Sequence, residues 1–183
     1  MKIINKLYIK NNEAKIIREI ISGKVFIYPT DTIYGIGANA KKDTAVNKIR
    51  EIKERETKPF SVIAPSKKWI KDNFLIDNKI KQWIGKLPGN ITLFLDKKEL
   101  SCVSDEVNPT DDSLGVRIPK HWFTKIISKA NVPFITTSVN KSGHSYMRRI
   151  EDIDSAILNS VDYVVYEGEK ANKESEKIDL RKN

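Results

Sequence analysis

A chain of 183 residues, 39% hydrophobic and 31% charged, is long enough to bury a core and suits one domain spanning residues 1–183. Its net charge of +9 favours a polyanionic partner such as tRNA, other RNA or a nucleotide, although a lysine-rich composition explains the charge equally well. The only cysteine, Cys102, excludes an intrachain disulfide and a cysteine-based zinc cluster. The N-terminus carries no apolar leader or membrane span, so a cytoplasmic location is expected.

Apolar periodicity and turn residues predict helices and strands that alternate along the chain. A first helix carries Ile16 and Ile20 and ends at Gly23. Asp43 is expected to cap the next helix, and Pro59 ends helical order. Strands are predicted at 25–28, 60–64, 91–95, 114–118, 134–137 and 163–166, and further helices at 66–74, 77–86, 122–130 and 150–158. This alternation is typical of a mixed α/β fold.

Two polar segments have no helical periodicity. Residues 96–112 contain a turn at Asn108-Pro109, and they are the best candidate for a mobile loop over a site. The tail, residues 167–183, is strongly charged and is expected to be mobile in isolation. Within the tail, Ile178 and Leu180 have the spacing of one edge strand.

The segment Tyr28–Gly37 joins hydroxyls, a carboxylate and two glycines to an apolar strand. Thr30 and Thr32 are expected to emerge at the end of that strand, where open sheets bind ligands. Gly35 and Gly37 would let backbone N–H groups approach an anion. The alternative is an ordinary polar turn, and the segment alone favours neither interpretation.

Three cations, Lys53, Arg55 and Lys58, lie just before a predicted strand. Lys53 and Arg55 share a face only if the backbone is extended there, and the set would then clamp a triphosphate together with an amino-acid carboxylate. The alternative is a solvated helix end, where cations are favourable without any ligand. Arg117 lies inside an apolar strand, where a ligand carboxylate, or else Asp111 or Asp112, would pair with it.

A second strand leads into clustered hydroxyls, an amide and a glycine over residues 134–143, a composition that suits a phosphate or adenylate pocket or simply closes a turn. His121 is expected to be a surface or capping residue, whereas His144 could line the site. Neither a P-loop nor a Gly-x-Ser-x-Gly elbow is present, and two isolated histidines with one cysteine do not supply a metal cluster. Covalent catalysis is therefore disfavoured.

Several of these segments occur in the order seen in the YrdC/TsaC family. The chain resembles this family in residues 28–37, Lys53-x-Arg55, Lys58-Pro59, 87–89, 114–117 and 137–143. The resemblance implies a short, single-domain YrdC-like fold, in which helices flank a twisted mixed parallel and antiparallel sheet with a basic concave site. It also implies an L-threonylcarbamoyladenylate synthase, which converts L-threonine, bicarbonate and ATP to threonylcarbamoyl-AMP and pyrophosphate. The product would serve threonylcarbamoyl modification of the adenosine beside the anticodon in tRNA.

The resemblance also implies roles for individual residues. It places L-threonine at Thr32, Arg117, Ser138 and Ser175, with Arg117 taking the carboxylate, and it places ATP at Arg55, Lys58, Ser113, Asn140 and Arg148. Lys53, Arg55 and Arg117 are the implied catalytic residues, and Mg²⁺ would accompany ATP with no fixed protein metal site. Val139 replaces a usual alanine, and the motif around Ser175 is altered, which puts the role of Ser175 in doubt.

Two kinds of macromolecular partner are expected for such a protein, namely tRNA or double-stranded RNA and the proteins that transfer threonylcarbamoyl to tRNA. No membrane partner is expected. The alternative from another functional class is a non-catalytic double-stranded-RNA or tRNA-binding module with the same fold, because basic charge supports binding as well as catalysis.

Overall fold

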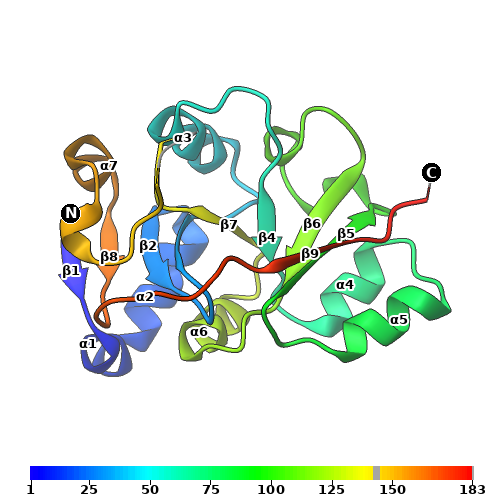
Figure 1. The fold of residues 1–183 in the computed structure, drawn as a ribbon, viewed down its shortest axis with the longest axis horizontal. Helices are drawn as coiled ribbons and strands as arrows, with labels where there is room; N and C mark the ends of the chain where they lie inside the picture. Colours follow the sequence, from blue (N-terminus) through cyan, green and yellow to red (C-terminus); the bar gives the residue numbers. More distant parts are fainter. Residues whose placement is uncertain (142–144, 183) are drawn as a thin grey trace.

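The computed structural model describes residues 1–141 and 145–182. Ser142, Gly143 and His144, which the sequence analysis assigned to the second strand-to-loop segment or to the site, lie outside the described residues, as does Asn183. The described residues form one sheet of nine strands in the order β1-β8-β2-β3-β7-β4-β6-β5-β9 (Figure 1). The strands are β1 Lys2–Ile4, β2 Phe26–Pro29, β3 Tyr34–Gly37, β4 Ser61–Ile63, β5 Ile91–Asp96, β6 Ser113–Arg117, β7 Phe134–Ser138, β8 Tyr163–Val165 and β9 Glu176–Asp179.

The strand pairing is mixed, as the sequence analysis predicted. The β1/β8, β2/β8, β4/β6 and β5/β9 pairs are parallel, and the β2/β3, β3/β7, β4/β7 and β5/β6 pairs are antiparallel. The edge strand predicted in the tail is confirmed as β9, which lies along β5 at one end of the sheet.

Seven α-helices flank the sheet within the described part of the chain. They are α1 Lys6–Asn11, α2 Glu13–Ser22, α3 Asp43–Lys53, α4 Lys67–Asn73, α5 Asn78–Gly85, α6 Trp122–Ala130 and α7 Ser155–Ser160. The boundary of α2 at Gly23 is confirmed, because this glycine adopts the left-handed conformation with φ of 93°. His121 caps α6 by accepting the backbone N–H of Phe123, which confirms its capping role. Asp43 is the first residue of α3 rather than its cap, because Lys42 occupies the N-cap position.

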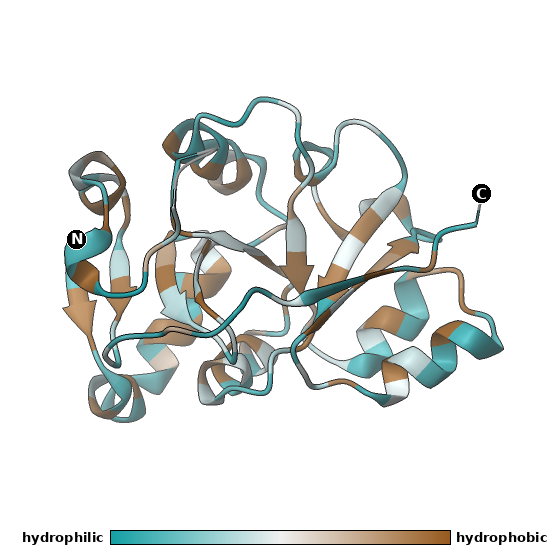
Figure 2. Ribbon diagram, viewed as in Figure 1, coloured by the Kyte–Doolittle hydropathy of each residue, from teal (hydrophilic) through white to brown (hydrophobic). Residues whose placement is uncertain are grey.

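Alternating side chains of β2 pack on opposite faces of the sheet. Phe26 and Tyr28 belong to the cluster formed with α1, α2 and α6, whereas Ile27 belongs to the cluster that includes α3. Figure 2 shows that the helices around the sheet carry both hydrophobic and hydrophilic segments. The Tyr28 ring stacks on Phe123 of α6 with 5.3 Å between centroids. Trp69 and Trp83 are half-buried and pack against the larger cluster.

The register of the central strands shows which face carries the site. Ile63 of β4 pairs with Phe134 of β7 and with Arg117 of β6, and register partners point to the same face. Ile63 and Phe134 pack in the same cluster as α2 and α6. Arg117 therefore projects from the α6 face. The tail crosses the front of the central strands between β8 and β9 in Figure 1.

Three sequence predictions were wrong in detail. Residues 96–112 are not a loop over the site, because they form the 3₁₀ turns Leu100–Cys102 and Asp105–Val107, and Val107 is fully buried. The helix predicted at 150–158 is divided into the 3₁₀ turn Ile150–Asp152 and α7, which is capped by Asp154. The segment 34–37, for which the sequence analysis predicted a glycine-containing loop or turn, is strand β3. No helix among the described residues is long and apolar enough to cross a membrane.

Candidate functional site

A cavity of about 400 Å³ lies over the central strands, where the tail passes. Its described lining comes from the β2–β3 connection, the segment after α3, the five strands β3, β4, β5, β6 and β7, and the tail. The lining residues are Thr30, Thr32, Ile33, Tyr34, Gly35, Arg55, Lys58, Pro59, Phe60, Ser61, Thr92, Phe94, Arg117, Thr136, Thr137, Ser138, Glu174, Ser175 and Lys177. Six sequence-predicted site residues are thus brought together: Thr32, Arg55, Lys58, Arg117, Ser138 and Ser175.

Arg117 forms a buried ion pair at the wall of this cavity. Its Nη2 lies 2.6 Å from Oδ1 of Asp31, and its Nη1 lies 3.4 Å from Oγ1 of Thr32. The Nε atom is buried without a hydrogen-bond partner in the structure. Burial lowers the pKa of Arg117, and the charge of Asp31 opposes that shift. The protein partner of Arg117 is therefore Asp31, rather than Asp111 or Asp112.

The segment after α3 delivers Arg55 to the cavity. Glu54 takes the left-handed conformation with φ of 50° and ends the helix, so Arg55 turns back toward the sheet. Arg55 donates to the carbonyl oxygens of Lys58 and Pro59 and lies over the ring of Phe60. Burial, and secondarily the charge of Arg50, lowers the pKa of Arg55 to about 10. Its guanidinium is thus held in place before any ligand arrives.

Lys53 has a different position from Arg55. It is the last residue of α3, and its Nζ donates to the carbonyl oxygens of Ser138 at 2.5 Å and Asn140 at 2.8 Å, and to Oδ1 of Asn140 at 3.0 Å. Burial, followed by the charge of Arg55, lowers the pKa of Lys53 to about 7. The backbone between the two cations is helical and then left-handed, so the extended geometry that would put them on one face is absent.

Ser138 and Asn140 form a hydrogen-bonded pair that also contacts Lys53. Oγ of Ser138 donates to Oδ1 of Asn140 at 2.6 Å, and the same amide oxygen accepts from Lys53. Ser138 lines the cavity, whereas Asn140 is not among its described lining residues. Lys53 therefore ties the loop after β7 to the end of α3.

The tail contributes three lining residues and is anchored at both of its ends. Oγ of Ser175 lies 2.8 Å from Oγ1 of Thr92, and β9 then pairs with β5. At the other end, Glu167 accepts from the indole Nε1 of Trp122 at 2.7 Å, and Tyr34 donates to the Gly168 carbonyl oxygen. Burial raises the pKa of Tyr34 to about 12.

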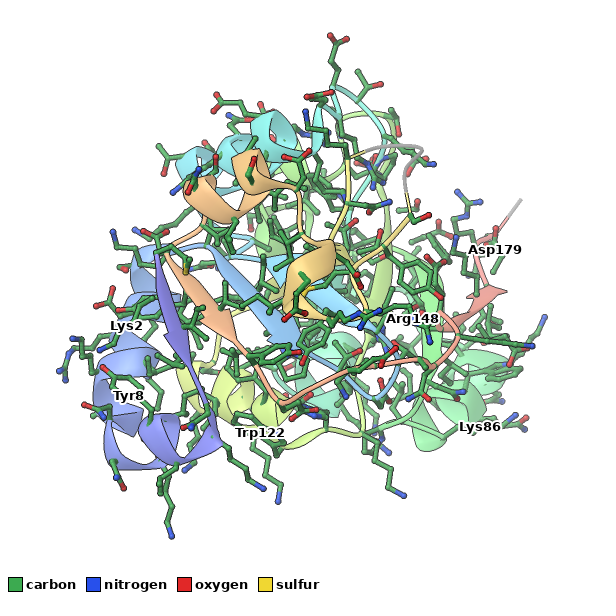
Figure 3. The ribbon with its side chains drawn as sticks, turned by 60° about the vertical axis from the view of Figure 1, so that its left-hand side comes forward. Lys2, Tyr8, Lys86, Trp122, Arg148 and Asp179 are labelled. Carbon is green, nitrogen blue, oxygen red and sulfur yellow. The ribbon has the colours of Figure 1, made fainter. Side chains whose placement is uncertain are left out.

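Besides Asn140, two further predicted ATP residues lie outside the described lining of the cavity. Ser113 is buried at the start of β6, where its backbone N–H donates to Asp111. Arg148 pairs with Glu169 of the tail at 3.2 Å, at the surface shown in Figure 3.

The glycines of β3 do not form an anion-binding loop, which corrects the sequence interpretation. They lie in a strand that pairs with β2 and β7. A Cβ on Gly37 would collide with the backbone carbonyl of Ile135, and one on Gly35 would lie 3.2 Å from the Tyr28 ring. Glycine is required at position 37 because β7 approaches so closely.

Sequence reasoning missed Thr92, Phe94, Thr136 and Glu174 as lining residues. Thr92 and Phe94 alternate along β5 and therefore share a face, which is a signal that could have found them together. Glu174 had no signal except its place next to Ser175. Among the described residues, no group of three or more His, Cys, Asp and Glu side chains is arranged to hold a metal ion.

Comparison with known proteins agrees with the fold and with the order of the motifs. A family model for Sua5, YciO and YrdC proteins, described as telomere recombination, matches residues 18–183. A Methanocaldococcus jannaschii protein provisionally named threonylcarbamoyl-AMP synthase is 38% identical over 88% of this chain and 79% of its own length. The threonylcarbamoyl-AMP synthase of Pseudoalteromonas atlantica is 27% identical over 78% of this chain and 79% of its own length.

Solved structures of related proteins have the same fold. Pyrococcus abyssi Sua5 complexed with L-threonine superposes with a TM-score of 0.85 at 27% identity over 98% of this chain. Escherichia coli YciO superposes with a TM-score of 0.81 over 95% of this chain and 86% of its own, and its 21% identity supports the fold alone. This chain spans 54% of the length of the Pyrococcus protein. The family model and the Methanocaldococcus relative together show that the chain belongs to the Sua5/YciO/YrdC family.

Proposed function

We propose that this protein is an L-threonylcarbamoyladenylate synthase that forms threonylcarbamoyl-AMP and pyrophosphate from L-threonine, bicarbonate and ATP. One observation carries the proposal: a single cavity joins the Arg117–Thr32 pair to the preset cation Arg55 and to Lys58 and Ser138. A guanidinium beside hydroxyls suits an amino-acid carboxylate, and the second cationic group suits a triphosphate. The names of the relatives and the L-threonine complex of Pyrococcus Sua5 support the same substrates.

The reaction needs positioning more than a protein nucleophile. The threonine nitrogen attacks bicarbonate to form a carbamate, water departs, and a carbamate oxygen then attacks the α-phosphate of ATP and displaces pyrophosphate. Holding the two reactants together converts this second step into an effectively unimolecular one. Arg55 and Lys58 stabilise the charge on the phosphates. Arg117, Thr32, Ser138 and Ser175 hold threonine.

Lys53 acts in this proposal as a positioning residue. Its three hydrogen bonds go to oxygens of the 138–140 loop, so it sets Ser138 and Asn140 rather than touching the phosphates. Ser113 and Arg148 complete the ATP assignment only if binding draws them toward the cavity. Mg²⁺ enters with ATP, because Glu174 is the single carboxylate among the described lining residues and cannot form a metal site alone.

The deciding experiment is pyrophosphate release by the purified protein with ATP, Mg²⁺, bicarbonate and labelled threonine, each omitted in turn. Release that requires both threonine and bicarbonate, together with isolation of the labelled adenylate, supports the proposal. Pyrophosphate release that does not depend on threonine, or no pyrophosphate release by the folded protein, contradicts the proposal. The product would be passed, in a cytoplasmic setting, to proteins that modify tRNA.

One observation favours the second candidate, a double-stranded-RNA or tRNA-binding module. Helices α1, α2, α4, α5 and α6, along the lower side of Figure 1, carry eleven Lys or Arg against three Asp or Glu. They therefore account for +8 of the net charge of +9. Binding through this surface would weaken steeply with salt, and it would not require Arg55 or Arg117.

A further inference from the structure

The described lining of the cavity is cationic except at one position. Arg55, Lys58, Arg117 and Lys177 face a single carboxylate, that of Glu174. The carboxylate of Asp31 is committed elsewhere, because it accepts from Arg117 at 2.6 Å and from the backbone N–H of Lys120 at 2.8 Å. Glu174 is exposed, and no described residue forms a hydrogen bond with its carboxylate, whose charge acts to raise the pKa of Lys53.

Glu174 directly precedes two anchored residues, and this fixes where its side chain starts. Ser175 is bonded to Thr92 through the two hydroxyls, and the backbone N–H of Glu176 donates to the Asn90 carbonyl oxygen at 2.9 Å. The tail cannot slide along β5 without breaking both bonds. A functional group at position 174 is therefore held at the cavity rather than on a free arm.

The sheet register sets the separation between Arg117 and this part of the tail. Leu93 pairs with Val116 in the antiparallel β5–β6 ladder, so Thr92 lies opposite Arg117. Thr92 in turn pairs with Lys177 of β9 on its other side. Two strand spacings, roughly 10 Å, therefore separate the backbones of Arg117 and Lys177. Glu174 lies three residues before Lys177 and lines the same cavity as Arg117.

The ammonium group needs an acceptor, and Glu174 is the only anionic acceptor in the described lining. The hydroxyl of Tyr34 already donates to the Gly168 carbonyl oxygen. Those of Thr30 and Thr32 bond to each other at 2.9 Å. A carboxylate also attracts an ammonium group through its full negative charge, which a neutral hydroxyl lacks.

We propose that Glu174 accepts the α-ammonium group of the amino acid whose carboxylate is bound by Arg117. The inference rests on the proposed function, since it names the second charged anchor of the same substrate. It makes the cavity selective for a zwitterion: Arg117 and Glu174 together exclude both simple carboxylic acids and simple amines. It also orients the nitrogen, which attacks bicarbonate after the Glu174 carboxylate has accepted the ammonium proton.

The test compares Glu174→Gln with Glu176→Gln in the full chain. Glu176 is also an exposed glutamate, two residues away, and it is absent from the described lining, so it is a matched control. We expect Glu174→Gln to raise the KM for L-threonine at least tenfold and to leave the KM for ATP within twofold. Glu176→Gln should leave both constants within twofold. Inhibition by 3-hydroxybutyrate, which lacks the amino group, should be equal in wild type and Glu174→Gln.

Two outcomes overturn the inference: an unchanged KM for threonine, or equal rises in both KM values, which would indicate that Glu174 only shapes the tail. Calorimetric titration with L-threonine alone separates the inference from the proposed function. If wild type releases no pyrophosphate, the proposed function fails. Weaker binding of threonine by Glu174→Gln than by wild type would still support the role of Glu174 as the ammonium acceptor. Equal binding by the two proteins, or no binding by wild type, would refute that role.

Discussion

Asp31 and Arg117 lie 86 positions apart in the sequence, and their side chains meet at 2.6 Å with only 12% and 7% of their surfaces exposed. The pair closes one wall of the cavity and fixes the guanidinium on which amino-acid binding depends. Because both charges are enclosed, each is stable only while the other is present.

Replacing Asp31 by Asn should therefore destabilise the protein. The change leaves the Arg117 charge buried without its counterion, which costs about 3–5 kcal/mol in the free energy of unfolding. Asp72→Asn removes an exposed ion pair with Lys68 and should cost within about 0.5 kcal/mol. Urea denaturation of both variants measures the difference in their free energies of unfolding. Equal losses in the two variants would show that the Asp31–Arg117 pair does not stabilise the fold more than an exposed ion pair does.

The lowered pKa of Lys53 predicts a pH-dependent stability. Folding lowers this pKa from its usual value near 10.4 to about 7, so the unfolded chain binds more protons than the folded one between these values. The free energy of unfolding should therefore rise with pH across this window, with a slope approaching about 1.4 kcal/mol per pH unit from this group. Lys53→Gln should lose that part of the slope. If the free energies of unfolding of wild type and Lys53→Gln changed in parallel from pH 7 to 10, the lowered pKa of Lys53 would be contradicted.

Gly37→Ala should be one of the most damaging small substitutions in the chain. The new methyl group would meet the backbone carbonyl of Ile135, which cannot move without disturbing β7, so a loss of about 1–3 kcal/mol or more is expected. Gly85→Ala is the control, because its Cβ meets no heavy atom within 4 Å at the end of α5, and a helical alanine is favourable. Thermal unfolding should rank Gly85→Ala at or above wild type and Gly37→Ala far below it.

Arg55→Ala tests the ATP half of the site. The guanidinium is positioned by carbonyl oxygens and by Phe60, so its loss should lower kcat/KM for ATP at least a hundredfold while the far-UV circular dichroism spectrum stays unchanged. Lys41→Ala, an exposed cation outside the described lining, should leave kcat/KM within twofold. Full turnover by Arg55→Ala would contradict the role assigned to Arg55.

The sequence predicted elements well where periodicity and caps agreed. The boundaries of α6 were predicted correctly because five buried residues recur at helical spacing after the capping residue His121. Strand β3 was missed because its glycines resemble a turn, and only the approach of β7 explains them. Residues 96–112 were misassigned because their buried side chains, such as Val103 and Val107, are too widely spaced for a pattern.

The site was predictable in its chemistry but less so in its geometry. Hydroxyls after a strand and a lone arginine within one indicated Thr32 and Arg117. No local pattern could indicate that Asp31 pairs with Arg117, or that Lys53 serves the 138–140 loop, because those contacts join residues at least 85 positions apart. Such long-range pairings follow from strand order, which single-sequence periodicity does not specify.

The position of β9 at the sheet edge has a consequence for biosynthesis. The tail supplies Glu174, Ser175 and Lys177, whereas most of the lining is translated before residue 139. A nascent chain on the ribosome can therefore assemble the central strands, yet it leaves the cavity open on one side until the tail has emerged and paired with β5. Translation that stops before residue 174 would yield a protein with a largely formed sheet and an incomplete pocket, so premature termination and loss of substrate capture would coincide.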